Sequence, residues 1–557
     1  MSEAVQYVAL QTHLWHLTLH IQVFTLQGNH TVGFFDSGRS WGQKHHAKKK
    51  KKAPNQSPAG QSHAPGASQA PSRRIAAAAS PGGPQDSRAR SKLPPGPAPL
   101  PLIGNLWTIG FQIHHETLLK MAGRHGNMYT LWLGQTPVIV LNGFQAVKDA
   151  LISHSEDFVD RPITPFFRDV TGGPQGIIFA NGHTWKQQRR FSLMTLRNLG
   201  LGKKTLEEWV QGQAQLLVQT FAREQGRPMD PSVSILSSIN NVIAAVLFGH
   251  CFSSEDDSFQ QLFKGSQAMA EFQGTIWPRL YDAFPSLMKH LSPVFMRSLL
   301  ALTHMQDLRR LIKDEIKSHQ SSWVPEKSQD FIDSYLSQIW KTKDNPTSTF
   351  KETNMIQVIA DLFIAGSDTT TISLLWSILY MMAHPEIQER VQKELDTTIS
   401  SSREIRYEDR MILPYTNAVL HEVLRYSSIS AIGVIRKCAK DTTVQGFPVS
   451  KGTLIYPNLF SVLYDPDHWE TPQEFNPSHF LDKGGNFLNK EAFLPFSAGH
   501  RVCLGEQLAK TSLFIMFSSL LRAFTFRLPE GVKEINKKPI VGFILQPQPY
   551  KMCAVPR

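Results

Sequence analysis

Apolar residues recur at helical spacing along most of the chain. Residues 352–384 are apolar on nearly every face, which predicts a long helix buried at the centre of the fold. Helical patterns of the same kind cover residues 414–426 and 506–524. Two short apolar runs, 128–133 and 137–141, flank a Gly-Gln-Thr turn and predict a β-hairpin. The pattern therefore predicts a mainly α fold with a minor β region.

Residues 1–91 lack this pattern. The moderately apolar run at 5–26 is interrupted by His and Gln, whereas a transmembrane helix needs about 20 predominantly apolar residues. The run also lacks the basic start and clean apolar core of a signal peptide. Residues 53–91 are rich in Pro, Ala, Ser and Gly. We therefore predict a disordered, basic tail at 1–91 and a single domain at 92–557.

The positive charge of the chain is concentrated in that tail. The net charge is +12, and the first 92 residues hold 12 Lys/Arg against 3 Asp/Glu, so the rest carries only +3. This distribution is poor evidence for nucleic acid, and no nucleic-acid partner is predicted. Five consecutive lysines at 48–52 indicate a solvated charge run, with a nuclear signal or an anionic-lipid contact as alternatives.

Four cysteines are scattered along the chain, and none forms a Cys-x-x-Cys pair. That argues against structural zinc, an iron–sulfur cluster or a disulfide framework, and favours a reducing, cytosol-facing environment. Cys503 lies in the stretch Phe-Ser-Ala-Gly-His-Arg-Val-Cys-Leu-Gly at 496–505, directly before the predicted helix at 506–524. A helix N-terminus favours a thiolate, and a thiolate in a glycine-lined loop can ligate haem iron. A buried structural cysteine is the alternative.

A polar stretch, Ala-Gly-Ser-Asp-Thr-Thr-Thr at 365–371, interrupts the predicted central helix. Ser and Thr disfavour helix interiors because they can bond the backbone, and Gly366 weakens the helix further. Such a patch inside a buried helix is costly unless it has a function. A hydrogen-bonded core patch is the alternative interpretation.

Together, the cysteine loop and this polar patch resemble the cytochrome P450 superfamily. Phe-x-x-Gly-x-Arg-x-Cys-x-Gly is similar to its haem-binding loop, with Phe496, Cys503 and Gly505 at matching positions. The resemblance implies haem b with Cys503 as the axial iron ligand, and Thr369 and Asp368 as the residues that handle dioxygen and protons. It also implies NADPH-dependent monooxygenation, with NADPH–cytochrome P450 reductase as electron donor and cytochrome b5 as a further candidate partner.

The resemblance further implies a set of residues that hold the haem propionates, namely Arg161, Trp185, Arg189, Arg436 and Arg501. Trp185 and Arg189 lie four residues apart on one predicted helical face, and ordinary packing of Trp beside a solvated Arg is the alternative. A basic strip follows at Arg190, Arg197, Lys203 and Lys204. It is either solvated surface or a means of attracting an acidic reductase.

Three more residues are implied to stabilise the region around the cysteine. Glu422 and Arg425 lie three residues apart in the predicted helix at 414–426 and can pair. His479, in Phe-Asn-Pro-Ser-His-Phe at 475–480, stands where many relatives have arginine.

Membrane attachment is also implied by the resemblance. The proline-rich lead-in at 92–97 is predicted to be extended, and it is similar to the hinge that follows a membrane anchor in microsomal members. Residues 277–288 would then dip into the bilayer and roof the substrate channel, with core packing as the alternative. The expected location is the cytosolic face of the endoplasmic reticulum membrane.

Segments at 197–204, 413–419 and 501–509 look like family 2 members, closest to subfamily J. That likeness implies epoxidation or hydroxylation of polyunsaturated fatty acids such as arachidonic acid, and of xenobiotics. Candidate pocket residues are Phe363, Ile364, Ala365, Ile432 and Ile544, with a β-turn at 538–545 lining the pocket. Alternatives are a steroid or drug hydroxylase, a haem-binding but inactive form, and a haem-thiolate isomerase. The intact Asp368–Thr369 pair argues against the isomerase.

Overall fold

The computed structural model describes residues 93–110, 113–200, 204–253, 278, 281–282, 285–286, 300–325 and 328–557. The predicted tail at 1–91, Lys203 and most of the predicted channel roof at 277–288 lie outside these residues. Within the described chain, the extended lead-in is confirmed: residues 94–99 form no helix, and the amide of Thr130 donates to the carbonyl of Pro95 at 3.0 Å.

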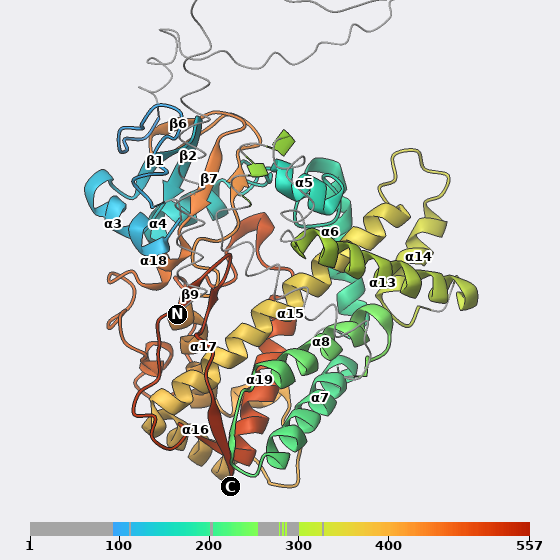
Figure 1. Ribbon diagram of the computed structural model, residues 1–557, viewed down its shortest axis with the longest axis vertical. Helices are drawn as coiled ribbons and strands as arrows, with labels where there is room; N and C mark the ends of the chain where they lie inside the picture. Colours follow the sequence, from blue (N-terminus) through green and yellow to red (C-terminus); the bar gives the residue numbers. More distant parts are fainter. Residues whose placement is uncertain are drawn as a thin grey trace, which may run out of the picture. The chain divides into compact units, whose positions relative to one another are not determined.

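Helices dominate the described residues, as the hydrophobic pattern predicts (Figure 1). They are α3 (His115–His125), α4 (Gly143–Lys148), α5 (Pro165–Thr171), α6 (Gly182–Asn198), α7 (Lys204–Arg223), α8 (Ser232–Phe248), α13 (Leu300–Ser322), α14 (Phe331–Lys341), α15 (Glu352–Ala383), α16 (Pro385–Thr398), α17 (Pro414–Ser427), α18 (Leu459–Leu463) and α19 (Glu506–Ala523). Short turns of other helix types are η1 (Asp149–Ser153), η2 (Tyr407–Met411), η3 (Pro477–Phe480) and η4 (Gly499–Arg501).

The β structure is minor and falls into small sheets. The largest has the order β1 (Met128–Leu133), β2 (Thr136–Leu141), β7 (Leu454–Pro457) and β4 (Arg436–Lys437). β1 and β2 form the predicted hairpin, pairing Met128 with Leu141 and Leu133 with Thr136. The other strands are β3 (Pro228–Met229), β5 (Thr442–Val444), β6 (Phe447–Val449), β8 (Phe524–Arg527), β9 (Ile540–Val541), β10 (Leu545–Gln546) and β11 (Met552–Pro556).

Helix α15 lies at the centre of the described domain, between α8, α17 and α19 (Figure 1). It is 32 residues long, and nearly every side chain before Leu362 and after Thr369 is buried. By length and hydropathy it is the one described helix able to cross a membrane, but 67% of its most apolar window is buried inside the protein. Its continuous hydrophobicity is therefore that of a core helix.

Candidate functional site

The cysteine loop connects η4 to the first turn of α19. The Cys503 amide donates to the Phe496 carbonyl at 3.0 Å, which closes the loop behind the sulfur. Gly499 has φ +73°, and a Cβ there would stand 1.8 Å from the Leu151 carbonyl oxygen of η1. Gly499 is thus required by both its conformation and its close approach. Gly505 caps α19 with φ −89°, so only the first of these two glycines needs the left-handed region.

Cys503 is accessible to solvent, but protein atoms surround its thiol closely enough to desolvate a thiolate. Burial raises the pKa of the thiol, and the backbone N–H groups of Gly505 and Glu506 act in the opposite direction. The N-terminus of α19 therefore favours the thiolate, as predicted, but burial outweighs it in the protein alone. A coordinated metal cation deprotonates a thiol outright, so a metal would reverse the balance.

The polar patch of α15 is the part of the helix where its surface opens. Ala365 is exposed and Thr369 is half-buried, in contrast to the buried residues on both sides. The Thr369 hydroxyl donates to the Ala365 carbonyl at 2.7 Å, and the helix continues through Gly366. A Cβ at Gly366 would stand 2.8 Å from Ile243 Cδ1, so glycine here permits close packing against α8.

The patch and the cysteine loop border the same hydrophobic cluster. Phe363 is a buried member of that cluster, and Ile364 packs against it from α15. Leu504, the residue after Cys503, also packs against this cluster. Two segments about 130 positions apart in the chain therefore pack against one hydrophobic cluster.

Four arginines from distant segments gather beside the cysteine loop: Arg161, Arg189, Arg436 and Arg501. Burial, together with the positive charge of the others, lowers the pKa of Arg161, and it lowers the pKa values of Arg436 and Arg501 to about 9. Within the described chain, none of the four forms a salt bridge with a carboxylate. A buried group of like charges is unfavourable unless an anion compensates it.

Three buried N–H groups of this cluster have no hydrogen-bond partner: Arg161 Nε, Arg436 Nε and Trp185 Nε1. An unsatisfied buried donor costs about 1–3 kcal/mol. Free donors and uncompensated positive charge both suit a carboxylate-bearing ligand. The residues present therefore fit a haem, whose propionates would supply the missing acceptors and negative charge.

Arg501 differs from Arg161 and Arg436 because all three of its guanidinium nitrogens donate to protein oxygens. In Arg161 and Arg436 a terminal nitrogen does so, but Nε does not. Nε donates to the Val159 carbonyl at 2.8 Å, and the two terminal nitrogens donate to oxygens of residues 177–181. Its guanidinium also lies over the Trp185 ring, 4.1 Å from the ring centre. Arg189 behaves similarly, donating to the Val502 carbonyl at 2.7 Å. Both side chains hold the cysteine loop against neighbouring segments in addition to contributing charge.

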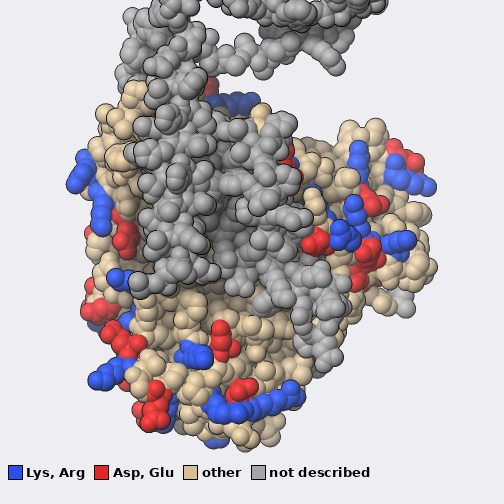
Figure 2. Space-filling model, in the orientation of Figure 1, with Lys and Arg blue, Asp and Glu red and all other residues tan. Residues whose placement is uncertain are grey.

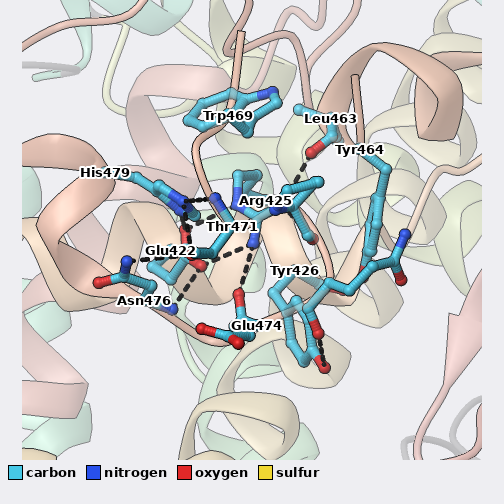
Figure 3. Close-up of polar contacts among 12 residues, drawn as sticks. Glu422, Arg425, Tyr426, Leu463, Tyr464, Trp469, Thr471, Glu474, Asn476 and His479 are labelled. Atoms are coloured by element: carbon cyan, nitrogen blue, oxygen red, sulfur yellow. Dashed lines mark hydrogen bonds and ion pairs between the residues drawn. The ribbon is translucent and has the colours of Figure 1, made fainter. Parts of the chain in front are cut away.

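Glu422 and Arg425 form a fully buried pair on α17 (Figure 3). Two Arg425 nitrogens donate to the two Glu422 oxygens, each at 2.7 Å. The remaining Arg425 donors reach the carbonyls of Leu463, Pro472 and Glu474 at 2.8–3.0 Å. The spacing predicts the pair, and the carbonyl acceptors explain how two buried charges are tolerated.

His479 joins this pair through Glu422, as Figure 3 shows. Its Nδ1 lies 3.3 Å from Glu422 Oε2, and its Nε2 accepts from the Thr471 amide at 3.2 Å. Since Nε2 accepts a backbone N–H, the ring carries its proton on Nδ1 and donates it to Glu422. A neutral histidine thus occupies the position.

The candidate pocket residues differ in exposure. Ala365 is exposed, while Ile364 and Ile432 are half-buried. Phe363 and Ile544 are buried in core clusters, and Phe363 packs near Phe248 with ring centres 6.3 Å apart. The expected turn at 538–545 corresponds to the antiparallel pair β9–β10.

Asp361 is a buried acidic residue that the sequence analysis did not single out. It is buried on α15, where burial raises the pKa of its carboxyl to about 6. Its oxygens accept hydrogen bonds from Ile177, Ile178 and Gln357 at 2.7–3.0 Å. The available signal was an acidic residue within the apolar run Val-Ile-Ala-Asp-Leu-Phe, where an unpaired charge is rare.

Comparison with known proteins gives a consistent result. The family model for cytochrome P450 matches residues 94–554. Cytochrome P450 2J5 of Mus musculus is 41% identical over 471 residues, covering 85% of this chain and 93% of the relative. Cytochrome P450 2J2 of Homo sapiens is 41% identical over 470 residues, covering 84% and 92%. Cytochrome P450 2D6 of Homo sapiens is also 41% identical, over 479 residues, covering 84% and 95%.

These likenesses fit family 2, subfamily J. Proteins of the family are haem-containing monooxygenases that use NADPH through a reductase, so haem is the cofactor and oxidoreduction the reaction class. The cysteine loop, the buried cluster of four arginines and the family match over residues 94–554 agree. The chain belongs to the cytochrome P450 family.

Proposed function

We propose that this monooxygenase epoxidises or hydroxylates polyunsaturated fatty acids such as arachidonic acid, and also oxidises xenobiotics. The observation that carries the proposal is the exposed stretch of α15 at Ala365, bordered by half-buried Ile364. An otherwise buried helix that opens at an apolar position suits a lipophilic substrate. The similarity to two subfamily J relatives supports the fatty-acid class.

The placement of the site residues supports the following roles. Cys503 would bind the haem iron through its thiolate, and the donors of Arg161, Arg436 and Trp185 that lack protein partners would hold the propionates. When bound, the haem supplies the oxidation chemistry, helped by electron density from the thiolate. Phe496 and Gly505 shape the loop around the sulfur.

Thr369 and Asp368 handle protons on the α15 side. The Thr369 hydroxyl donates to the Ala365 carbonyl, and it can rotate to serve as a donor toward dioxygen. Thr369→Ala should consume NADPH without forming a matching amount of product, while Thr369→Ser should keep the two coupled. Equal coupling in Thr369→Ala and the unaltered protein would remove this role.

Electrons come from a reductase, for which the exposed Arg190 and Arg197 of α6 offer positive charge. Attraction between oppositely charged surfaces raises association rates more than it raises affinity. Cytochrome b5 is a further candidate partner, and the endoplasmic reticulum membrane is the expected location.

A drug-type hydroxylase is the second candidate function, because the identity to cytochrome P450 2D6 equals that to subfamily J. The deciding experiment incubates the purified protein with reductase, NADPH and arachidonic acid, and identifies products by mass spectrometry. Epoxides and hydroxy acids support the fatty-acid proposal. Turnover of drug-like compounds without oxidation of the fatty acid would replace it with the second candidate.

A further inference from the structure

Residues 176–181 lie between helix α15 and the cysteine loop and are held from both sides. From α15, Asp361 Oδ2 accepts the amides of Ile177 at 2.7 Å and Ile178 at 3.0 Å. The chain can approach this closely only because residue 176 is glycine. Gly176 has φ +77°, and a Cβ there would stand 2.3 Å from the same carboxylate oxygen.

From the other side, Arg501 holds the carbonyls of the same segment. Its Nη1 donates to the Ile177 oxygen at 2.8 Å, and its Nη2 donates to the Ala180 oxygen at 2.6 Å. Arg501 is the last residue of the η4 turn and lies two residues before Cys503. The position of the segment therefore bears directly on the position of the cysteine loop.

One peptide group joins the two charges. The amide of Ile178 and the carbonyl of Ile177 belong to the same planar unit, which has little freedom to twist. Its N–H donates to the Asp361 carboxylate and its oxygen accepts from the Arg501 guanidinium. Both hydrogen bonds are charge-assisted, and each polarises the peptide group in the direction that strengthens the other.

We propose that Asp361 is a positioning residue for the haem-thiolate centre, acting through the Ile177–Ile178 peptide group and Arg501 to hold Cys503 in place. Asp361 does not need to touch haem or substrate for this. Its own orientation is maintained by Gln357, which donates to Oδ1 at 2.8 Å and accepts from Arg309 at 2.5 Å. The chain of contacts thus runs from α13 through α15 to the cysteine loop.

Two substitutions separate the hydrogen bonds from the space that the side chain fills. Asp361→Asn keeps an oxygen able to accept both amides, whereas Asp361→Leu has a similar size and no acceptor. Leu379→Ala is the matched control, because Leu379 is fully buried on the same helix and far along it from the segment. That substitution lowers stability through lost core packing and leaves the hydrogen bonds of residues 176–181 in place.

The haem-loaded proteins are reduced under carbon monoxide, and the fraction with the thiolate-type Soret band is measured together with the haem midpoint potential. In Asp361→Leu, the fraction of protein that lacks the thiolate-type Soret band should be severalfold larger, and the haem midpoint potential should shift. Hydrogen exchange at the Ile178 amide should be faster. Leu379→Ala should keep the spectrum and potential of the unaltered protein. Asp361→Asn, which keeps an acceptor for the amides but loses the charge, should shift both less than Asp361→Leu does. Should Asp361→Leu fail to fold, Asp361→Ala replaces it as the variant without an acceptor.

An unchanged spectrum and potential in the variant without an acceptor would overturn the proposal. The same shift in Leu379→Ala would also overturn it, because a general loss of stability would then explain the effect. A shift in Asp361→Asn as large as in Asp361→Leu would overturn the claim that the accepted hydrogen bonds carry the effect.

Discussion

Buried donors without acceptors are the most informative single-residue feature of the site. The resemblance in the sequence picked out Arg161, Trp185 and Arg436, and the structure leaves one N–H of each unpaired. The sequence could not show that Arg501 donates its hydrogen bonds to backbone oxygens, because those oxygens belong to a segment more than 300 positions away. The residues of the cluster could be predicted from the sequence. Which arginines keep a free N–H group and which bond the backbone could not.

Cys503→Ser should abolish the thiolate-type Soret band of the reduced, carbon monoxide-bound protein. Serine has a similar size but does not present a thiolate to iron. The half-buried Cys553 of β11 provides the control, since Cys553→Ser removes a thiol from the same chain away from the loop. If the band persists in Cys503→Ser, or disappears in Cys553→Ser, the ligand assignment is wrong.

Arg436→Leu should have opposite effects on the haem-free and haem-loaded forms. Without haem, it removes one of several mutually repelling buried cations, so the unfolding midpoint should rise or stay level. With haem, it removes a charge-assisted hydrogen bond of about 1.5–3 kcal/mol, which corresponds to roughly tenfold or greater loss of haem affinity. Transfer of haem to apomyoglobin measures the second effect.

Arg190→Leu removes an exposed arginine on neighbouring α6 and should leave haem transfer unchanged. Haem transfer at the original rate in Arg436→Leu would show that this arginine does not hold the propionates.

At the scale of elements, the long helices were predictable and the short strands were not. The sequence pattern placed the central helix at 352–384, and α15 covers Glu352–Ala383. The helix predicted to end at 524 ends at Ala523, where Phe524 becomes extended and begins β8. Strands such as β3 and β4 have two residues each, too few for any periodicity, and they form because tertiary contacts bring partners alongside.

Arg425→Leu should destabilise the domain by about 3–5 kcal/mol, because it leaves the buried Glu422 carboxylate without its partner. Chemical unfolding of the haem-loaded protein, followed by circular dichroism, gives the magnitude. Arg310→Leu provides the comparison: Arg310 pairs with Asp307 on the exposed surface of α13, where such pairs contribute about 0–1 kcal/mol. Equal losses in the two variants would mean that the buried pair has no special structural role.

At the scale of the whole molecule, composition predicts the charge distribution and a domain boundary near residue 92. Positive and negative side chains are interspersed on the described part of the face in Figure 2, consistent with the small net charge of +3 after residue 92. The family match begins at residue 94, and the Thr130 side chain already bonds the Pro94 carbonyl at 2.8 Å. Both observations support a functional domain that starts near residue 92.

Deletion of residues 1–91 should therefore leave the haem spectrum and the unfolding midpoint of the domain unchanged. A loss of haem or a lower midpoint in the shortened protein would contradict the boundary. Removal of Lys92 to Pro97 as well provides the contrasting variant, because it takes away the Pro94 and Pro95 carbonyls that Thr130 uses. That longer deletion should lower the midpoint.

The neutral ring of His479 makes positions 471 and 479 interdependent. Its Nε2 is an acceptor for the Thr471 amide, whereas an arginine at 479 would offer only donors. His479→Arg alone would therefore bring two donors face to face beside a carboxylate that already accepts two hydrogen bonds from Arg425. The effect of an arginine at 479 therefore depends on the backbone at Thr471, whose amide must find another acceptor before arginine is tolerated.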